Sequence, residues 1–206
     1  MRSKLHAYFF RLVGVLALSG FFCVNVYAGN QKEEALADSV KLALSRAISG
    51  NRAPLRFENP ELRARYQGWL VVMEKKVEKR ILHHAVRQEF LETVWYEATR
   101  AGLDPTLVLA LIRVESGFRK YAVSSAGARG YMQVMPFWAK LVGDGDSRKL
   151  FQLQANLRYG CSILRMYLDI ENGNLYYALG RYNGSRGRPE YPRAVLGLWE
   201  NLRRGT

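Results

Sequence analysis

Apolar residues recur at helical spacing along most of the chain after residue 30, and no segment of useful length alternates apolar and polar residues as a strand would. Glycine and proline divide this pattern into separate helices. Gly102 ends one helix, whereas Asn59-Pro60 and Asp104-Pro105 each supply a capping side chain followed by proline at the first helical position. We therefore expect a mostly α-helical fold. The predicted helices cover residues 31–48, 61–84, 85–101, 105–115, 132–142 (broken or restarted at Pro136), 154–170, 175–182 and 190–202.

The first 28 residues have the composition of a secretory signal peptide. Three basic residues and no acidic one accompany an apolar stretch over residues 12–24, and Val26-Tyr27-Ala28 is a small-residue cleavage site. We expect cleavage after Ala28 and export to the periplasm or cell envelope. An uncleaved anchor is the alternative, but the stretch is shorter than the roughly 20 residues of a membrane span. A lipoprotein signal at Cys23 is a second alternative, against which the bulky preceding Phe22 argues.

The remaining residues suffice for one substantial domain with a smaller extension. We expect a signal peptide over residues 1–28, an N-terminal helical region over 29–87 and the main domain over 88–206.

The chain is strongly basic, with a formal net charge of +13. Such a charge favours peripheral contact with a membrane or with anionic envelope polymers, although scattered basic residues also form ordinary solvated faces. No zinc-finger spacing or RNA-recognition signature occurs, so no nucleic-acid partner is expected. Cys161, alone once the signal is removed, fits a buried apolar position, and the adjacent His83-His84 pair lacks the spacing of zinc ligands. We expect no metal and no organic cofactor.

Glu115 is the most informative candidate for chemistry. It ends an apolar helical run and is followed by Ser116 and Gly117. Apolar surroundings raise the pKa of a carboxyl group and suit it to act as a general acid. The local sequence alone equally allows a helix-end glutamate that caps a loop or pairs with Arg113 or Arg119.

Two further motifs follow Glu115. Gly127 and Gly130 permit positive φ and close approach of a ligand, although an ordinary tight turn explains them as well. Gln133 offers a donor and an acceptor to a sugar, and the neighbouring methionines are either an apolar wall or part of the core. Tyr182 and Asn183 can position a carboxyl or substrate group, or end a helix together with Gly184.

Taken together, residues from about 89 to 201 resemble the lysozyme-like catalytic domain of the soluble lytic murein transglycosylases, which cut the glycan strands of bacterial peptidoglycan. The order and spacing of five short motifs carry the resemblance: Gly102-Leu103-Asp104-Pro105, Glu115-Ser116-x-Phe118, Gly127-Ala128-x-Gly130 with the following Tyr131-Met132-Gln133-Val134-Met135-Pro136, Asn156-Leu157-x-x-Gly160, and Ala178-Leu179-x-x-Tyr182-Asn183-Gly184. The chain departs from the family pattern at Tyr131, at Gly180-Arg181 and in the basic segment 185–192.

The resemblance implies a goose-type lysozyme-like helical domain and peptidoglycan glycan strands as the partner. The helical spacing of residues 29–87 adds an N-terminal helical extension, which the resemblance does not cover. It implies that Glu115 is the single acid/base, which protonates the leaving oxygen and then accepts a proton from the muramic acid 6-hydroxyl, so that a 1,6-anhydro end forms. The substrate-binding residues that it implies are Ser116, Tyr131, Met132, Gln133, Tyr182, Asn183 and Tyr191. Two alternatives stay open: a lysozyme-type hydrolase on the same scaffold, which usually needs a second carboxylate, and a non-catalytic peptidoglycan-binding protein.

Overall fold

The structure, a computed structural model, describes residues 31–50, 57 and 59–204. These residues are mostly helical, as expected, and no helix among them is long and apolar enough to cross a lipid bilayer. The predicted signal peptide and its cleavage site after Ala28 lie outside the described residues. The elements are α1 (Asp38–Ile48), α2 (Pro60–Val77), α3 (His84–Arg100), α4 (Pro105–Ser116), α5 (Pro136–Val142), the 3-10 helix η1 (Ser147–Phe151), α6 (Leu153–Ile170), α7 (Leu175–Asn183) and α8 (Glu190–Arg203).

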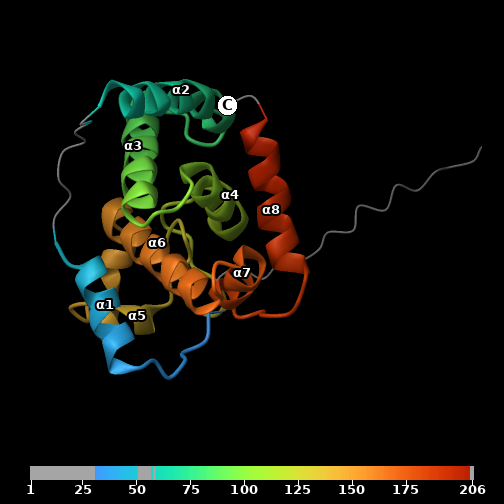
Figure 1. Cartoon of the computed structure of the whole chain (residues 1–206). Helices are drawn as coiled ribbons and strands as arrows, with labels where there is room; N and C mark the ends of the chain where they lie inside the picture. Colours follow the sequence, from blue (N-terminus) through green and yellow to red (C-terminus); the bar gives the residue numbers. More distant parts are fainter. Residues whose placement is uncertain (1–30, 51–56, 58, 205–206) are drawn as a thin grey trace, which may run out of the picture.

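Helix α4 lies at the centre of the fold, with the other helices around it (Figure 1). In this view α2 crosses the top, α3 and α8 descend on either side of α4, and α6 and α7 lie below it. Every residue from 106 to 112 is buried, which agrees with the prediction of a helix surrounded on most sides. The residues at the carboxyl end of α4 are therefore held by a rigid core.

Both ends of α4 are capped, and the cap at the amino end is the one that the sequence predicts. The Asp104 side chain accepts a hydrogen bond from the Thr106 amide at 2.7 Å, and Gly117 ends the helix in the left-handed conformation with a φ of 58°. The Trp199 indole of α8 donates to Asp104 Oδ2 at 2.8 Å, and the Trp69 indole of α2 donates to Thr106 Oγ1 at 3.0 Å. Three helices therefore meet at the amino end of α4.

Two helix predictions were too long. Residues 31–37 are not helical, because Gln31 is drawn into the fold, where its side-chain oxygen accepts hydrogen bonds from Trp138 Nε1 (2.9 Å) and from the Met135 amide (3.3 Å). The second predicted helix extended to residue 84, but α2 ends at Val77. There the chain turns to bury Ile81, whose carbonyl accepts a hydrogen bond from Arg87 of α3 at 2.7 Å.

The predicted helix over residues 132–142 starts only at Pro136, where a restart was considered. Gln133 has a positive φ of 49°, and the Val134 and Arg129 backbones pair with each other at 3.0 Å in both directions. These contacts hold residues 132–135 in a loop. The short 3-10 helix η1 was not predicted; its first turn is capped by Asp146, which accepts from the Arg148 amide at 3.0 Å.

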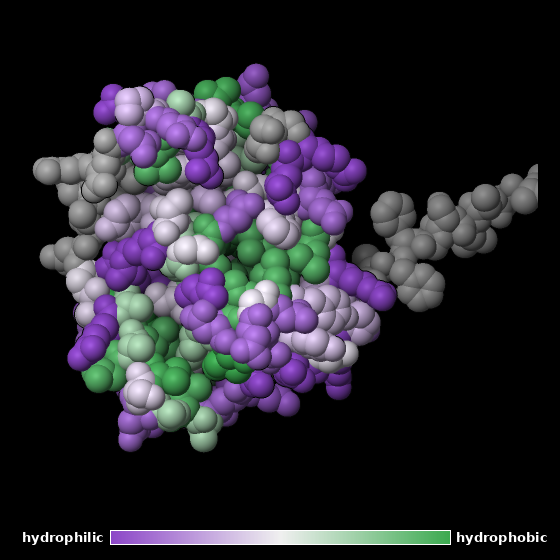
Figure 2. Space-filling view, viewed as in Figure 1, coloured by the Kyte–Doolittle hydropathy of each residue, from purple (hydrophilic) through white to green (hydrophobic). Residues whose placement is uncertain are grey.

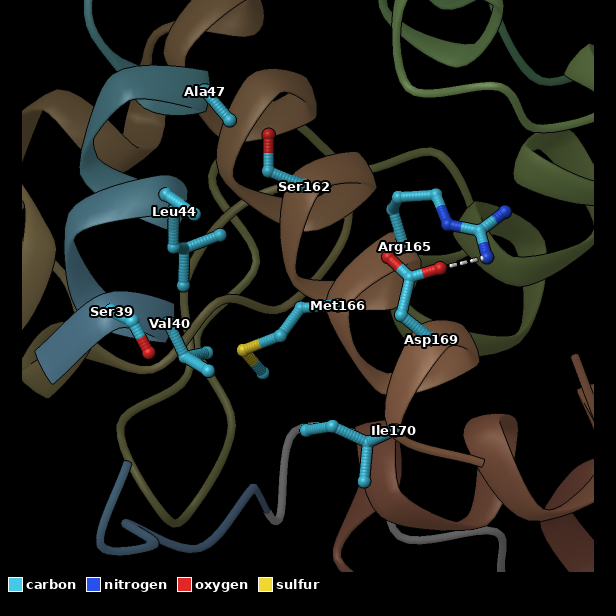
Figure 3. A pocket seen from close by; sticks show the side chains of 10 residues that line it. Ser39, Val40, Leu44, Ala47, Ser162, Arg165, Met166, Asp169 and Ile170 are labelled. Carbon is cyan, nitrogen blue, oxygen red and sulfur yellow. Dashed lines mark hydrogen bonds and ion pairs between the residues drawn. The ribbon is translucent and has the colours of Figure 1, made fainter. Parts of the chain in front are cut away.

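The described part of the N-terminal region packs on the main domain. Helix α1 contacts α5 and α6, and α2 contacts α3. Glu34, which precedes α1, forms an ion pair with Arg181 of α7 at 2.8 Å. A cavity of about 320 Å³ lies between α1 and α6 (Figure 3), with the ion pair of Arg165 and Asp169 at its edge. Its lining contains none of the predicted site residues, so we assign it to incomplete packing of α1 on α6.

Candidate active site

Glu115 lies in the last turn of α4, where the sequence pattern predicted a buried carboxyl group. Only 4% of the residue is exposed, and the neighbouring Ser116 is equally buried. The Ser116 hydroxyl donates to the Ile112 carbonyl of its own helix at 3.1 Å. The carboxyl group therefore lies at the edge of the core, at the point where α4 gives way to a loop.

Two tyrosines from distant helices converge on Glu115. The Tyr191 hydroxyl of α8 donates a hydrogen bond to Glu115 Oε1 at 2.5 Å. Burial raises the pKa of Tyr191 well above its usual value, and the charge of Glu115 raises it further. Burial likewise raises the pKa of Tyr182, with the Glu115 charge as the next cause. Both phenols therefore stay protonated and can donate hydrogen bonds beside the carboxyl group.

The Tyr182 hydroxyl, however, does not donate to Glu115. It donates to the Met132 carbonyl at 2.8 Å, and its side chain is fully buried. Tyr182 therefore fixes the loop that follows Gly130 against α7. Asn183, the last residue of α7, is also buried, and Gly184 in the left-handed conformation ends the helix.

The glycine motif forms a compact loop beside the end of α4. Gly127 and Gly130 have φ values of 87° and 75°, which glycine adopts without strain. The Gln133 side-chain amide donates to the Gly130 carbonyl at 2.9 Å and to the Ala122 carbonyl at 3.1 Å. The nitrogen of Gln133 thus holds the loop together.

The backbone has positive φ at two residues of this region that are not glycine. Phe118, just after α4, has a φ of 68°, and Gln133 has a φ of 49°. Residues other than glycine rarely adopt these values, and such strain is concentrated at functional sites.

Met132 and Tyr131 point into the core. Met132 is fully buried, and its sulfur lies against Gly160 of α6 so closely that a Cβ atom at Gly160 would approach it to 2.4 Å. The ring of Tyr131 packs on Phe90 of α3 with centroids 5.0 Å apart. Of the two interpretations of the methionine, the structure therefore agrees with the core position.

One residue of this region was quoted in the sequence pattern but not identified as important. Asn156 of α6 is fully buried, and its side chain bonds three backbone groups. Its nitrogen donates to the carbonyls of Leu150 (2.7 Å) and Arg129 (2.9 Å), and its oxygen accepts from the Met132 amide at 2.8 Å. Gln154 and Arg158 are polar neighbours of Asn156 in the same helix, so its polarity alone did not distinguish it in the sequence.

The surface around these elements is partly apolar. Figure 2, in the same view as Figure 1, shows an apolar area at the centre of this face, where α4, α7 and α8 meet, bordered by hydrophilic residues. The acid of α4, the phenols of α7 and α8 and the glycine loop therefore come together within one part of the fold.

Comparison with known proteins identifies the family of the chain. Residues 92–192 match the family model of the transglycosylase SLT domain. The membrane-bound lytic murein transglycosylase C of Actinobacillus pleuropneumoniae is 34% identical over 136 residues, which cover 66% of this chain and 36% of that protein. The protein of the same name from Haemophilus influenzae is 30% identical over 173 residues, which cover 76% of this chain and 47% of that protein. The chain thus matches less than half the length of these relatives.

A solved structure has a similar fold. It is that of an inactive variant of the lytic transglycosylase Slt from Pseudomonas aeruginosa, which matches 85% of this chain and 38% of its own with a TM-score of 0.52 at 19% identity. At this identity the likeness concerns the fold alone, which it identifies as lysozyme-like. The matched motifs, the family model and the helical architecture agree, and the chain belongs to the lytic murein transglycosylase family, with an SLT domain over residues 92–192.

Proposed function

We propose that the chain is an exported lytic transglycosylase that cleaves the β-1,4 bond between N-acetylmuramic acid and N-acetylglucosamine in peptidoglycan. The relatives are named lytic murein transglycosylases, which supports the reaction. The observation that carries the proposal is the buried Glu115 carboxyl group with the Tyr191 hydroxyl 2.5 Å from it.

The chemistry follows from the surroundings of Glu115. Burial favours the neutral form of a carboxyl group, which can then protonate the glycosidic oxygen as the bond to the muramic acid breaks. The hydrogen bond from Tyr191 stabilises the carboxylate that remains. This carboxylate then accepts the proton of the muramic acid 6-hydroxyl, whose oxygen bonds to C1 and closes the 1,6-anhydro ring. The proton that Glu115 gives to the leaving oxygen is thus replaced by the proton of the 6-hydroxyl, and no water is consumed.

A single carboxylate agrees with the chemistry of the buried groups. Glu97 is a second buried acid among the described residues, but it is bonded to the Arg158 guanidinium at 2.9 Å. An acid neutralised in this way has a structural role and cannot serve as the second catalytic carboxylate of a hydrolase. The inactive Slt of Pseudomonas aeruginosa carries glutamine in place of a glutamate, which supports the dependence of that protein on one glutamate.

We further propose roles for the residues around Glu115. Tyr191 is the positioning residue of the acid, while Tyr182 and Gln133 hold the loop that borders the sugar. The other residues that we propose for the substrate site are Ser116, Tyr131, Met132 and Asn183. Met132 would act by shaping the loop, because its carbonyl and amide are bonded to Tyr182 and Asn156.

The proposed location is the periplasm or cell envelope, after removal of residues 1–28. The basic and apolar composition of this segment supports export, and the curated relatives are named membrane-bound. Residues 29–87 and 88–206 would form the mature chain, in which α1 and α2 pack on the catalytic domain.

Digestion of purified peptidoglycan by the mature protein tests the reaction, with the released muropeptides identified by mass spectrometry. Anhydro products, lighter by one water than hydrolytic products, support the proposal. Products with reducing ends would instead indicate a lysozyme-type hydrolase.

The role of Glu115 is tested by Glu115→Gln, which keeps the shape of the side chain and removes its proton. Because general acid catalysis contributes about 100-fold to 10,000-fold, we expect a loss of rate of at least about 100-fold with unchanged thermal stability and unchanged binding to peptidoglycan. Glu78→Gln, at an exposed position after α2, is the matched control and should leave the rate unchanged. Turnover by Glu115→Gln at the wild-type rate would refute the assignment.

A further inference from the structure

Exposed aromatic and basic side chains gather immediately after the catalytic helix. We call residues 119–123, which line a hollow of about 420 Å³, the 119–123 shelf. Tyr121 is 70% exposed and Val123 is 61% exposed, and Arg119 and Lys120 are exposed as well. Large side chains that lie in water next to one another contribute little to the core, and such patches mark binding surfaces.

The shelf is continuous with the proposed active site. The Arg119 side chain donates to the Ser116 carbonyl at 2.9 Å, one residue from the acid. The Ala122 carbonyl accepts hydrogen bonds from the Gly130 amide at 2.9 Å and from the Gln133 side chain at 3.1 Å. A ligand seated on the glycine loop and extending outward would therefore reach the shelf.

The exposed ring of Tyr121 is supported from one side. The centre of its ring lies 6.0 Å from the centre of the Phe151 ring in η1. The Arg129 guanidinium lies over the Phe151 ring, 5.5 Å from its centre. Arg129 in turn donates to the Ser147 carbonyl at 2.9 Å. The Tyr121 ring therefore has an aromatic neighbour on one side, while most of its surface stays open to a ligand.

The charge of this part of the chain selects the kind of ligand. Residues 116–143 contain four basic residues and no acidic one. The Lys120 ammonium group lies 5.4 Å from the centre of the Tyr121 ring, so a cation and an apolar surface are presented together. A flexible ligand with carboxylate groups and short apolar side chains matches this combination, whereas a neutral sugar makes no use of the cations.

We propose that the 119–123 shelf binds the carboxylate-bearing stem peptide that hangs from the muramic acid residue. This inference rests on the proposed function, because it assumes that peptidoglycan occupies the active site. The glycan strand itself lies in the cleft, and the peptide leaves it over the shelf. Peptide-bearing strands are then bound more tightly than strands without peptides.

Binding can be measured without cleavage by placing Glu115→Gln in every variant. Affinity is measured by calorimetry with soluble glycan strands that carry stem peptides and with the same strands after an amidase has removed the peptides. We expect tighter binding to the peptide-bearing strands, and we expect Lys120→Glu combined with Tyr121→Ala to remove this preference. Lys75→Glu, which makes the same charge change at an exposed position of α2, should keep it.

The kinetic comparison uses the chain with Glu115 intact and the same two kinds of strand. The double variant should raise KM for the peptide-bearing strands about threefold to tenfold, as expected for exposed contacts of this kind, and leave kcat and the peptide-free reaction unchanged. Equal losses on both substrates would overturn the inference, as would equal binding of both kinds of strand by the protein with an unaltered shelf. Lys120-dependent binding to vesicles of anionic lipid with no preference between the two kinds of strand would also overturn it. If the wild type cleaves neither substrate, the proposed function fails, and the calorimetric result still decides whether the shelf binds peptides.

Discussion

Replacing Asn156 with alanine would remove the side chain that connects α6 to the loop beside Glu115. The Asn156 amide bonds the carbonyls of Arg129 and Leu150 and the amide of Met132, at distances between 2.7 and 2.9 Å. No part of the residue is exposed, so the three backbone groups lose their partner in a buried environment. We expect Asn156→Ala to destabilise the fold and to lower activity through displacement of the loop.

The magnitude follows from the number of bonds. A buried backbone group without a partner costs about 1–3 kcal/mol, so three groups have an upper limit near 9 kcal/mol. Removal of the amide also leaves space against Gly130, where a water can restore part of the lost bonding. The expected net loss is therefore about 3–4 kcal/mol, which is a large fraction of the 5–15 kcal/mol that typically stabilises a domain.

Urea unfolding followed by circular dichroism measures this loss. With a slope of about 2 kcal/mol per molar urea, the midpoint should fall by roughly 1.5–2 M. The control is Gln152→Ala, which removes a longer amide at the start of the same helix, where the side chain makes no cap; it should shift the midpoint by less than about 0.3 M. A loss below about 1 kcal/mol for Asn156→Ala would show that the three bonds do not hold the loop.

The remaining predictions concern Tyr182 and Glu171. Tyr182→Phe leaves the buried Met132 carbonyl without its donor, so we expect the free energy of unfolding to fall by about 1–3 kcal/mol. The thermal midpoint should fall by roughly 3–10 °C, and the rate should be reduced. An unchanged midpoint and rate would show that the hydroxyl is not used. Hydrogen bonds from Arg186, and then from Arg181, lower the pKa of Glu171 from 4.5 to about 2. Its contribution to stability is therefore complete above pH 4.5 and is lost as the pH falls toward 2, so urea unfolding should find Glu171→Gln less stable than wild type at pH 7 and equal to it near pH 2. A stability difference that does not change over this range would contradict the assignment.

Local signals made α4 predictable. Three signals lie within the helix or beside it and act on their own neighbours: the capping residue Asp104, the proline that follows and the apolar run. The same holds for the position of Glu115, because the end of a buried helix can be read from its sequence.

Contacts between distant residues were not predictable in the same way. Residues 31–37 have helical spacing, yet Gln31 is held by Trp138, 107 positions away, and this contact outweighs a weak local preference. Gln133 was identified as a residue with a donor and an acceptor, but the sequence did not reveal that its donor is occupied by the Gly130 and Ala122 carbonyls. The role of Asn156 likewise depends on the path of a loop 24 positions earlier.

The register between α4 and α8 explains why the Tyr191 hydroxyl lies next to the Glu115 carboxyl group. Glu115 and Tyr191 are 76 positions apart, but the same two helices are also joined by the bond between Asp104 and Trp199. Asp104 precedes α4, and Trp199 lies near the end of α8, so the helices run antiparallel and are fastened at both ends. At a rise of about 1.5 Å per residue, these bonds lie roughly 12–16 Å apart along the helices, and a slip by one turn would move the Tyr191 hydroxyl about 5.4 Å from the carboxyl group. The hydrogen bond at Glu115 is therefore a consequence of packing along the whole α4–α8 interface, and the rigidity of that interface orients the acid before a substrate binds.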